Sequence, residues 1–362
     1  MGEDLGKKTT RRDIPLPPPP GAPSAAGGER VSWPWTEADG LGPESCRDDG
    51  DYPRITVITP SYNQGEFIEG TIRSVLLQAY PNLEYMVVDG GSSDGTVDVI
   101  RKYESHLAWW VSESDKGQSH AINKGLARST GEIVAYLNSD DMYCPGTLHS
   151  VGRYFSEHWD ADLLYGDCML IDDEDREMAL WRSRDFDLYA ELCRNFIYQP
   201  TVFMRERVIR KVGGFDENLD YVMDLDLWYR AAKHFRFHYI PERLACFRLT
   251  SDSKSGGSRV PFVREREEVL KRFLDSCGVD RVVGRWKQIL SWHHFHAGEQ
   301  LYNSGERKAA GAEFLKSMLM YPVSVRSIHA LLGIFDRYAG GNLFKKLNVR
   351  KNPSPDPARK YF

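Results

Sequence analysis

The sequence predicts an α/β protein in which a parallel sheet is flanked by helices, with an all-helical extension after it and a disordered tail before it. Between residues 53 and 141, short apolar runs alternate with segments of helical periodicity. The short runs are apolar almost throughout, which is typical of strands covered on both faces. From about residue 262 only helical periodicity remains, and a proline-rich stretch lies before residue 53.

The proline-rich stretch predicts a disordered tail over residues 1–52. Eight of the 19 prolines lie within the first 50 residues, four of them in the run from Pro17 to Pro20. Because the stretch holds few large aliphatic side chains, it cannot bury enough apolar surface to offset the entropy of ordering. A ligand for a proline-recognition domain is the alternative to a plain solvated leader.

Four strands and three helices are expected in the first half of the folded chain. The strands are rich in β-branched and aromatic residues and cover 55–59, 84–89, 109–111 and 133–137. The helices repeat apolar residues at helical spacing and cover 67–76, 97–103 and 121–131. Pro60 is expected to stop the first strand, since proline lacks the N–H that a sheet uses.

The second half is less regular. A short helix is expected to end at Val212 before Gly213 and Gly214, and another to run from Asp224 through His234. Separate strands are expected at 163–166, 169–171, around Trp181, 199–204, 237–240 and 245–248.

The C-terminal part reads as helices, and one stretch matches a repeat pattern. Within 291–322, five residues lie where a tetratricopeptide repeat places its signature side chains: Gly298, Leu301, Ala310, Phe314 and Pro322. Because three or more repeats normally form a stable array, we expect an ordinary packed tail, with a partner-binding repeat as the alternative. The predicted organisation is therefore a tail (1–52), a sheet domain (53–258), a helical extension (259–345) and a flexible C-terminus (346–362).

Composition limits the class of protein. With 47 Lys+Arg against 52 Asp+Glu, the net charge of −5 does not indicate a nucleic-acid binder. The six cysteines lie far apart without a CxxC pair, which favours a reducing cytosol over a disulfide framework or a zinc site. No apolar run approaches the ~20 residues of a spanning helix, and the N-terminus lacks a signal core. We expect a cytoplasmic protein, or one peripheral to the inner face of the membrane.

Polar residues follow each of the four predicted strands of the first half. They read PSYN from Pro60, DGGSSDG from Asp89, ESDKG from Glu113 and NSDD from Asn138. Ligands of parallel sheets bind beyond the carboxyl ends of the strands. The sequence therefore predicts one site that collects aspartates, small residues and a lysine.

Six motifs, in order along residues 54–250, resemble the family 2 glycosyltransferases, which have the GT-A fold and use sugar nucleotides. They are ITPSYN from Ile58, VVDGGSSDGT from Val87, DKGQ from Asp115, LNSDD from Leu137, GGFD from Gly213 and DLDLW from Asp224. The resemblance implies a GT-A sheet and transfer of a sugar from a nucleotide-diphosphate sugar, with a UDP-sugar favoured.

Asp140 and Asp141 are the predicted metal site. A diphosphate leaving group is negatively charged, and Mg²⁺ or Mn²⁺ held by carboxylates stabilises that charge. The resemblance implies that Asp141 binds the metal and that Asp140 contacts the ribose, or the metal through water. Asn138 stands where the family has its first aspartate, so the division between the neighbours stays open, and a plain polar turn is the alternative.

The first three loops are the predicted nucleotide site. The resemblance implies that Pro60, Ser61 and Tyr62 line the base, that Asp89 contacts base or ribose, and that Asp115 and Lys116 approach the nucleotide. A buried tyrosine is the alternative for Tyr62, and a helix cap is the alternative for Asp115. In the glycine-rich turn, Ser93 or Asp94 is expected to cap the next helix.

Asp224 is the predicted general base. An acceptor hydroxyl loses its proton as it attacks, and a nearby carboxylate contributes roughly 10²–10⁴-fold to the rate. The family carries this base in an acidic pair before DLW, and here Met223 replaces the first member. Asp226 reads as a first-turn residue favoured by the helix dipole, and Leu227 and Trp228 read as core.

Three further features complete the prediction. The resemblance implies that Gln199 contacts a sugar and that Arg248 pairs with the diphosphate, with a surface ion pair as the alternative for Arg248. The cluster His293, His294 and His296 reads as a core-edge group rather than a metal site, since no carboxylate partner is evident in the sequence.

The leading function is a metal-dependent, inverting glycosyltransferase that uses Mn²⁺ or Mg²⁺ and a glycan or lipid-linked acceptor. The alternative is a catalytically impaired sugar-nucleotide-binding or scaffolding protein that meets a protein partner through its helical tail. Asn138 and Met223 favour the alternative, whereas the four retained aspartates (Asp89, Asp140, Asp141 and Asp224) favour the enzyme.

Overall fold

The computed structural model describes Pro34 and residues 52–249, 260–276 and 285–321. Nearly all of the predicted tail (1–52), the predicted boundary at 258–259 and the predicted flexible end (346–362) lie outside the described residues. The chain divides into two compact units. The sheet unit holds the described residues up to Asp185 together with Ile197–Met223 and Ala231–Arg248, and the helical unit holds Phe186–Phe196, Asp224–Arg230 and the described residues from Leu249 onward.

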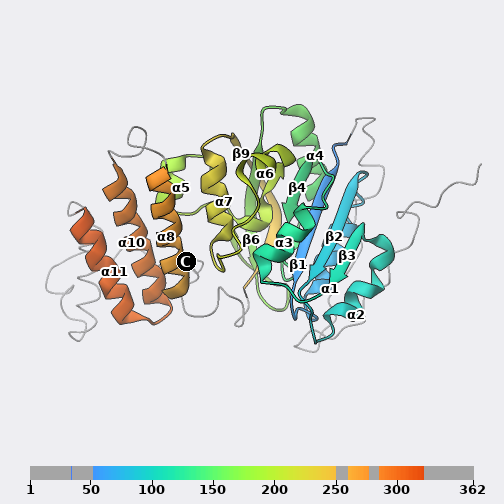
Figure 1. Ribbon diagram of the computed structural model, residues 1–362, viewed down its shortest axis with the longest axis horizontal. Helices are drawn as coiled ribbons and strands as arrows, with labels where there is room; N and C mark the ends of the chain where they lie inside the picture. The colour runs from blue at the N-terminus through green and yellow to red at the C-terminus, as the bar shows by residue number, and fades with distance from the viewer. Residues whose placement is uncertain (1–33, 35–51, 250–259, 277–284, 322–362) are drawn as a thin grey trace, which may run out of the picture. The chain divides into compact units, whose positions relative to one another are not determined.

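A nine-stranded sheet forms the centre of the sheet unit (Figure 1). Its order is β3-β2-β1-β4-β8-β6-β9-β5, and β7 pairs with β6. The first four strands are parallel to one another, as predicted, and span Ile55–Ser61 (β1), Leu83–Asp89 (β2), Trp109–Ser112 (β3) and Ile133–Tyr136 (β4). Their carboxyl ends therefore lie at one edge of the sheet.

Helices cover both faces of these strands. Ile55 and Val57 of β1 belong to a core that includes side chains of α1 (Ile68–Leu76) and α2 (Thr96–Lys102). Ile58 points to the opposite face, where α3 (Gln118–Leu126) packs so closely that a Cβ on Gly125 would lie 2.6 Å from Ile58 Cγ2. Such alternation along a strand explains why the strands are apolar at successive positions.

Pro60 does not stop β1, contrary to the prediction. The strand continues to Ser61, and Pro60 pairs with Val88 of β2. On its other side, β4 pairs with β1 only as far as Ile58. Pro60 therefore sits where one neighbour has ended, and a missing N–H costs little at such a position.

The second half contains longer strands than predicted. The two strands expected at 163–171 form one strand, β6 (Leu163–Ile171), and those expected at 237–248 form β9 (Phe237–Arg248). The pairing register of β6 and β9 shifts around Asp167. This irregularity lets each strand continue through the polar residues that interrupt its apolar pattern. The strand expected at 199–204 is instead a 3-10 turn, η4 (Gln199–Thr201), followed by β8 (Phe203–Arg205).

Other elements of the second half are short. The predicted strand around Trp181 is β7 (Glu177–Trp181), and the predicted helix before Gly213 is α6 (Glu206–Val212). Four further elements were not predicted from the sequence: η3 (Glu104–His106), β5 (Met142–Tyr143), α4 (Thr147–Glu157) and α5 (Leu188–Cys193).

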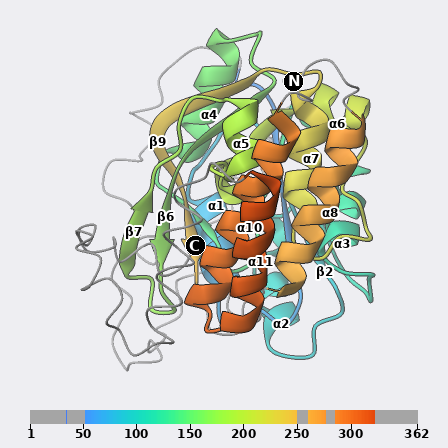
Figure 2. The same cartoon turned by 90° about the vertical axis from the view of Figure 1, so that its left-hand side faces the viewer.

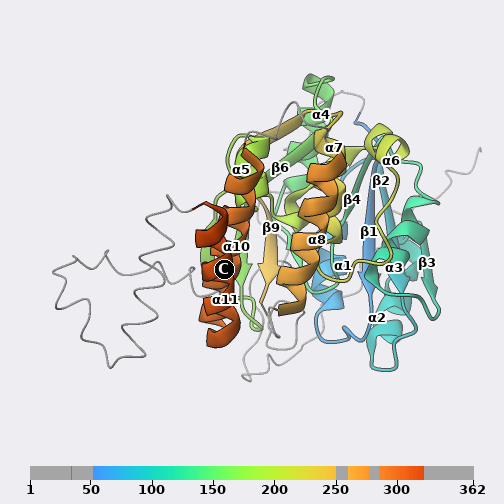
Figure 3. The same cartoon turned by 60° about the vertical axis from the view of Figure 1, so that its left-hand side comes forward.

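Three helices pack side by side in the helical unit, as Figures 2 and 3 show. They are α8 (Val260–Ser276), α10 (Trp286–Asn303) and α11 (Arg307–Met320). In the hairpin of α10 and α11, Gly298 lies so close to Phe314 that a Cβ would approach its ring to 2.8 Å. The predicted repeat positions therefore meet in one helical hairpin, except that Pro322 lies outside the described residues.

Two predictions about the whole chain can be compared with the described part. Cys144, Cys168, Cys193 and Cys246 are free thiols, as expected, while Cys46 and Cys277 lie outside the described residues. Among the described helices, none is long and apolar enough to cross a bilayer.

Candidate active site

The carboxyl ends of β1, β2 and β4 bring the predicted loops of the sheet unit together. Gly90 donates its backbone N–H to the Ser61 carbonyl at 2.8 Å. Asn63, in the left-handed region at φ 51°, donates its N–H to Ser92 Oγ at 2.7 Å and accepts the N–H of Ser93 at 2.9 Å. The loop after β1 is therefore tied to the glycine-rich loop after β2.

Asp89 shapes the glycine-rich loop. It is fully buried, and its Oδ2 accepts the N–H groups of Gly91 at 3.0 Å and Ser92 at 2.9 Å and the hydroxyl of Ser112 at 2.6 Å. The Ser92 hydroxyl donates to Oδ1. All these contacts are internal, so the geometry gives Asp89 a positioning role that the sequence prediction did not include.

The N-cap position of α2 is Gly95, not the predicted Ser93 or Asp94, but Asp94 bonds the first turn of that helix. Its Oδ1 accepts the N–H of Thr96, the first residue of α2, at 3.0 Å, and its Oδ2 accepts the N–H of Gly65 at 2.9 Å. These hydrogen bonds lower the pKa of Asp94 against the opposing effect of burial.

Tyr62 and Ser61 present different surfaces at the end of β1. The Tyr62 side chain is 63% exposed, so the buried alternative is wrong and its ring face is open for stacking. Ser61 is buried, and its hydroxyl has no hydrogen-bond partner in the described part of the chain. Because buried polar atoms are nearly always paired, the Ser61 hydroxyl is suited to meet a ligand atom.

Asp115 lies against the glycine-rich loop. A Cβ on Gly90 would come within 2.9 Å of Asp115 Oδ2, so only glycine leaves room for that carboxylate. The other oxygen, Oδ1, accepts the N–H of Gly117 at 2.8 Å, ahead of α3. Lys116 is exposed beside it. The structure thus brings Asp115 to the predicted nucleotide loops, and Asp115 does not cap α3, because the N-cap is Gly117 and Asp115 bonds only the N–H of that residue.

The Asp140–Asp141 pair follows β4. Asp141 is 1% exposed, and Asp140 is partly buried. Asp141 Oδ1 accepts the backbone N–H of Arg248 at 2.9 Å, and Oδ2 accepts an amide N–H of Asn138 at 3.3 Å. The Asp140 carboxylate, in contrast, accepts no side-chain or backbone hydrogen bond from another residue of the described chain.

Removal from water disfavours the negatively charged forms of both carboxyl groups. It raises the pKa of Asp140, and burial together with the neighbouring charge of Asp140 raises the pKa of Asp141 well above its ordinary value. Two adjacent buried carboxylates with spare lone pairs fit a divalent cation, which would supply the missing positive charge. The residues present therefore fit the metal that the family resemblance implies.

Asn138, the departure from the family pattern, is the centre of an amide network. Its side-chain oxygen accepts from Gln118 at 2.6 Å, and its amide nitrogen donates to Asp141 and, at 3.3 Å, to Gln199 Oε1. Gln199 in turn donates to the Tyr136 carbonyl at 2.8 Å. The structure thus joins Gln199 to the carboxylate pair, as predicted for a site residue, and adds Gln118, which lay in the DKGQ motif without a predicted role.

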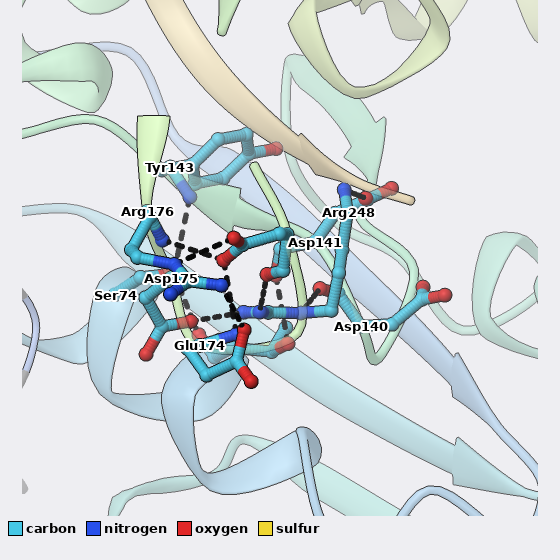
Figure 4. Close-up of polar contacts among 10 residues, drawn as sticks. Ser74, Asp140, Asp141, Tyr143, Glu174, Asp175, Arg176 and Arg248 are labelled. Atoms are coloured by element: carbon cyan, nitrogen blue, oxygen red, sulfur yellow. Dashed lines mark hydrogen bonds and ion pairs between the residues drawn. The ribbon is translucent and has the colours of Figure 1, made fainter. Parts of the chain in front are cut away.

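Arg248 is not at the surface, so the surface ion pair predicted as its alternative is wrong, and its pairing with the diphosphate stays a prediction. It is 2% exposed and lies over the ring of Phe67 at 4.8 Å. Its guanidinium donates to the carbonyls of Asp140 at 2.9 Å and Asp172 at 2.6 Å, and it forms an ion pair with Asp175 (Figure 4). Each of the three guanidinium nitrogens therefore has an acceptor within the protein.

The consequence is a supporting role for Arg248. Its backbone N–H bonds the Asp141 carboxylate while its side chain holds the Asp140 carbonyl, so a single residue fixes both neighbours (Figure 4). From the other side, Thr71 of α1 donates to the Asp141 carbonyl at 2.7 Å. This role could not be predicted from the sequence. An arginine near a predicted phosphate site gives the same sequence pattern whether its side chain points toward the site or into the protein.

Asp224 belongs to the helical unit, where it is the second residue of α7 (Met223–Ala232). It accepts the N–H of Leu225 at 2.8 Å. Burial, with a smaller contribution from the charge of Glu265, raises the pKa of Asp224 to about 6. A carboxylate with such a pKa is suited to accept a proton near neutral pH.

Asp226 has a different environment on the same helix. Its carboxylate pairs with Arg230 at 2.8 Å and lies 3.8 Å from Arg272. Leu227 and Trp228 are buried, as predicted for core residues. The ion pairs support the prediction that Asp226 has a structural place in the first turn.

Comparison with known proteins shows the family of the chain. The family model for glycosyl transferase family 2 matches residues 56–210. The Bacillus subtilis protein provisionally named teichuronic acid biosynthesis glycosyltransferase TuaG is 31% identical over 210 residues, which cover 56% of this chain and 82% of TuaG. The chain belongs to the family 2 glycosyltransferases. It is a transferase of glycosyl groups, and the motifs described above carry the family pattern.

Solved structures show the same fold. S. aureus TarS 1–349 in complex with UDP-GlcNAc has a TM-score of 0.51 and 17% identity, covering 80% of this chain and 92% of that one. The longer TarS structure gives a TM-score of 0.55 at 20% identity, with 79% of this chain covered, and this chain spans about 55% of its length. The Pyrobaculum calidifontis mannosyltransferase PcManGT, in complex with GDP-Man and Mn²⁺, has a TM-score of 0.53, 20% identity and coverage of 83% and 84%.

Proposed function

We propose that the chain is a metal-dependent, inverting glycosyltransferase that moves a sugar from a UDP-sugar to a hydroxyl of a glycan or lipid-linked acceptor. The observation that carries the proposal is the buried Asp140–Asp141 pair at the carboxyl edge of the sheet, with its raised pKa values. The named ligands of TarS and PcManGT, a UDP-sugar in one and a GDP-sugar with Mn²⁺ in the other, support a sugar-nucleotide donor and a divalent metal.

The residues of the sheet unit have the following proposed roles. Asp141 binds Mn²⁺ or Mg²⁺, and Asp140 contacts the ribose or a metal-bound water. When bound, the cation supplies positive charge to the departing diphosphate. Tyr62 stacks on the base, and Asp115 contacts the nucleotide beside Lys116.

Other residues prepare or complete the site. Pro60 and Ser61 line the base, and Asp89 holds the loop that meets it. Gln199 contacts a sugar through its free hydrogen-bonding capacity. Of these groups, the buried Ser61 hydroxyl is the one that has no hydrogen-bond partner among the described residues.

Asp224 is the proposed general base. Its carboxylate takes the proton from the acceptor hydroxyl as the oxygen attacks the anomeric carbon and the bond to the diphosphate breaks. One displacement of this kind inverts the anomeric centre and needs no covalent enzyme intermediate. A lipid-linked acceptor would place the protein at the inner face of the membrane, and the helical extension is the surface proposed for a protein partner.

A nucleotide-release assay with Mn²⁺ and single sugar nucleotides tests the function. We expect release from a UDP-sugar by the wild type, loss of release in Asp141→Asn, and unchanged release in Asp98→Asn, since the Asp98 side chain is 84% exposed on α2. Removal of metal with a chelator should abolish release, and added Mn²⁺ should restore it.

The alternative is a sugar-nucleotide-binding protein without catalysis, and Met223 in place of an acidic residue is the observation that favours it. In that case UDP and Mn²⁺ would raise the melting temperature of the chain while no nucleotide is released from any donor. If neither binding nor release is seen, both functions are wrong.

A further inference from the structure

Two successive histidines of the helical unit are buried, and three of their four ring nitrogens have no hydrogen-bond partner among the described residues. His293 and His294 on α10 have no exposed surface. Both ring nitrogens of His293 and the Nε2 of His294 are unpaired within the described residues. Because buried polar atoms are nearly always paired, three unpaired nitrogens in one place need an explanation that packing does not supply.

The fourth nitrogen is held by a carboxylate. His294 Nδ1 lies 2.7 Å from Glu313 Oε2, and Glu313 comes from α11. When Nδ1 carries the proton and donates it to the carboxylate, Nε2 presents a lone pair. This carboxylate–histidine arrangement is typical of histidines that bind a metal through their other nitrogen.

A third ligand comes from α8. Glu267 offers a carboxylate oxygen that lies, with one nitrogen each from His293 and His294, in a group whose atoms are all within 4.8 Å of one another. Ligand atoms around tetrahedral zinc are about 3.4 Å apart, from bond lengths of about 2.1 Å. Small side-chain rotations therefore bring the three ligands to one ion, with the fourth position left to water.

The charges around the cluster are compatible with a cation. Lys271 bonds Glu267 at 2.6 Å, and Lys316 bonds Glu313 at 2.7 Å, but both lysines are about half exposed and can turn to solvent.

We propose that Glu267, His293 and His294 bind one Zn²⁺ ion, with Glu313 orienting His294. Two imidazoles and a carboxylate suit zinc, whereas Mn²⁺ and Mg²⁺ prefer all-oxygen sites. The ion would join α8 and α10, with α11 as support, and so stabilise the helical unit. The site is independent of the proposed catalytic metal, and it corrects the expectation that this cluster has no carboxylate partner.

Arg266 provides the competing explanation. It is buried on α8, and its Nε and Nη2 are also unpaired within the described chain. If small movements let Arg266 donate a hydrogen bond to His293, the cluster would be a hydrogen-bonded polar group that holds no ion. The two explanations differ in whether the chain binds zinc at these residues.

A calorimetric titration of the metal-stripped full-length chain with Zn²⁺ alone tests the site. In a second titration, Co²⁺ replaces Zn²⁺ as a spectroscopic probe. We expect one tight Zn²⁺ per chain and the strong visible absorption of four-coordinate Co²⁺. Glu313→Gln should weaken binding about 10–100-fold, and His294→Ala should abolish it. His296→Ala is the matched control, since His296 on the same helix bonds Glu299 at 2.8 Å outside the cluster.

Two results would overturn the proposal. One is a wild-type chain that binds no Zn²⁺ and gives no four-coordinate Co²⁺ spectrum. The other is equal Zn²⁺ affinity in the wild type and Glu313→Gln, which decides the question even if His294→Ala fails to fold. Asp141→Asn should keep the zinc site intact, so failure here and failure of the catalytic proposal are distinguishable.

Discussion

At the scale of single residues, environment separates aspartates that look alike in the sequence. Asp89 and Asp226 have their carboxylates engaged by neighbouring protein groups, the Asp140 carboxylate has no such contact with the described residues, and Asp224 is partly buried with a raised pKa. The chemistry available to each follows from those contacts rather than from its motif.

Replacement of Asp224 by Asn tests its role as base. We expect kcat to fall roughly 10²–10⁴-fold with little change in donor affinity, because a general base acts on the chemical step. In the wild type, kcat should rise with pH through about 6, where Asp224 loses its proton. A steady-state pH profile measures both, and an Asn variant with wild-type kcat would contradict the assignment.

The same replacement has an opposite effect on stability. Since burial raises the pKa of Asp224 from 3.8 to about 6, folding binds a proton in that interval, and stability falls as the pH rises through it. Asn carries no charge, so above about pH 6 Asp224→Asn should be more stable than the wild type by up to about 3 kcal/mol. Urea unfolding at pH 4 and pH 7.5 measures the gain, which should be absent at pH 4.

Arg248→Met tests the buried support of the carboxylate pair. Removal of the guanidinium takes the ion-pair partner Arg248 from the 3% exposed Asp175 side chain, which should cost about 3–5 kcal/mol of unfolding free energy. Arg176→Met, on an exposed pair with Asp172, should cost less than about 1 kcal/mol. The double variant Arg248→Met/Asp175→Asn should recover much of the loss, and no recovery in denaturant unfolding would argue against the charge as the cause.

At the scale of elements, close approach between helices and neighbours depends on small residues. Gly125 lets α3 reach β1, and Gly298 lets α10 reach Phe314 of α11. A hydropathy pattern predicts that these helices exist, yet it does not say which turn of one helix meets which residue of the next. Glycines at the contacts fix that choice.

Two glycine variants in the helical hairpin test this. Gly298→Ala places a methyl group 2.8 Å from the buried Phe314 ring and should lower the unfolding free energy by about 1–3 kcal/mol. Gly311→Ala meets open space on α11 and should raise it by about 0.5–1 kcal/mol through helix propensity. Thermal unfolding of the two variants measures these changes. A change in unfolding free energy of the same sign in both variants would contradict the packing explanation.

At the scale of the whole molecule, the helical unit is not a simple C-terminal appendage. It includes Phe186–Phe196 and Asp224–Arg230, which are inserted between segments of the sheet unit in the sequence. Within it, the rings of Tyr229 and Phe273 lie 5.4 Å apart, and Asp226 lies near Arg272. The proposed base is therefore on a segment that packs with the helices.

A chain truncated after Leu249 tests this organisation. Loss of α8 exposes the buried ring of Tyr229 and removes Arg272 from Asp226. We expect the truncated chain to aggregate or to melt well below the full chain, and its nucleotide release to be lost. A truncated chain with full-length melting behaviour in scanning calorimetry would show that the two units are separable.

Much of the fold was predictable because local patterns determine it. Apolar strands alternating with amphipathic helices predicted the four parallel strands and their edge, and the six motifs predicted the family. Errors arose where distant pairing decides the outcome: β6 and β9 run through breaks in their own pattern because each is held by the other. The prediction that Pro60 stops β1 was wrong for the same reason. The point where β4 ends determines how much the missing N–H of Pro60 costs the sheet.

The sequence by itself determined the class of fold, the family and the set of loops that meet at one edge, since periodicity and strand direction are local properties. Only the tertiary structure decided where side chains point and what surrounds them. It turned Arg248 inward beneath Asp140 and Asp141, opened Tyr62, and brought Glu267 and Glu313 to the histidines of α10. Burial and pairing depend on residues far apart in the chain, and these set the charge and reactivity of each group.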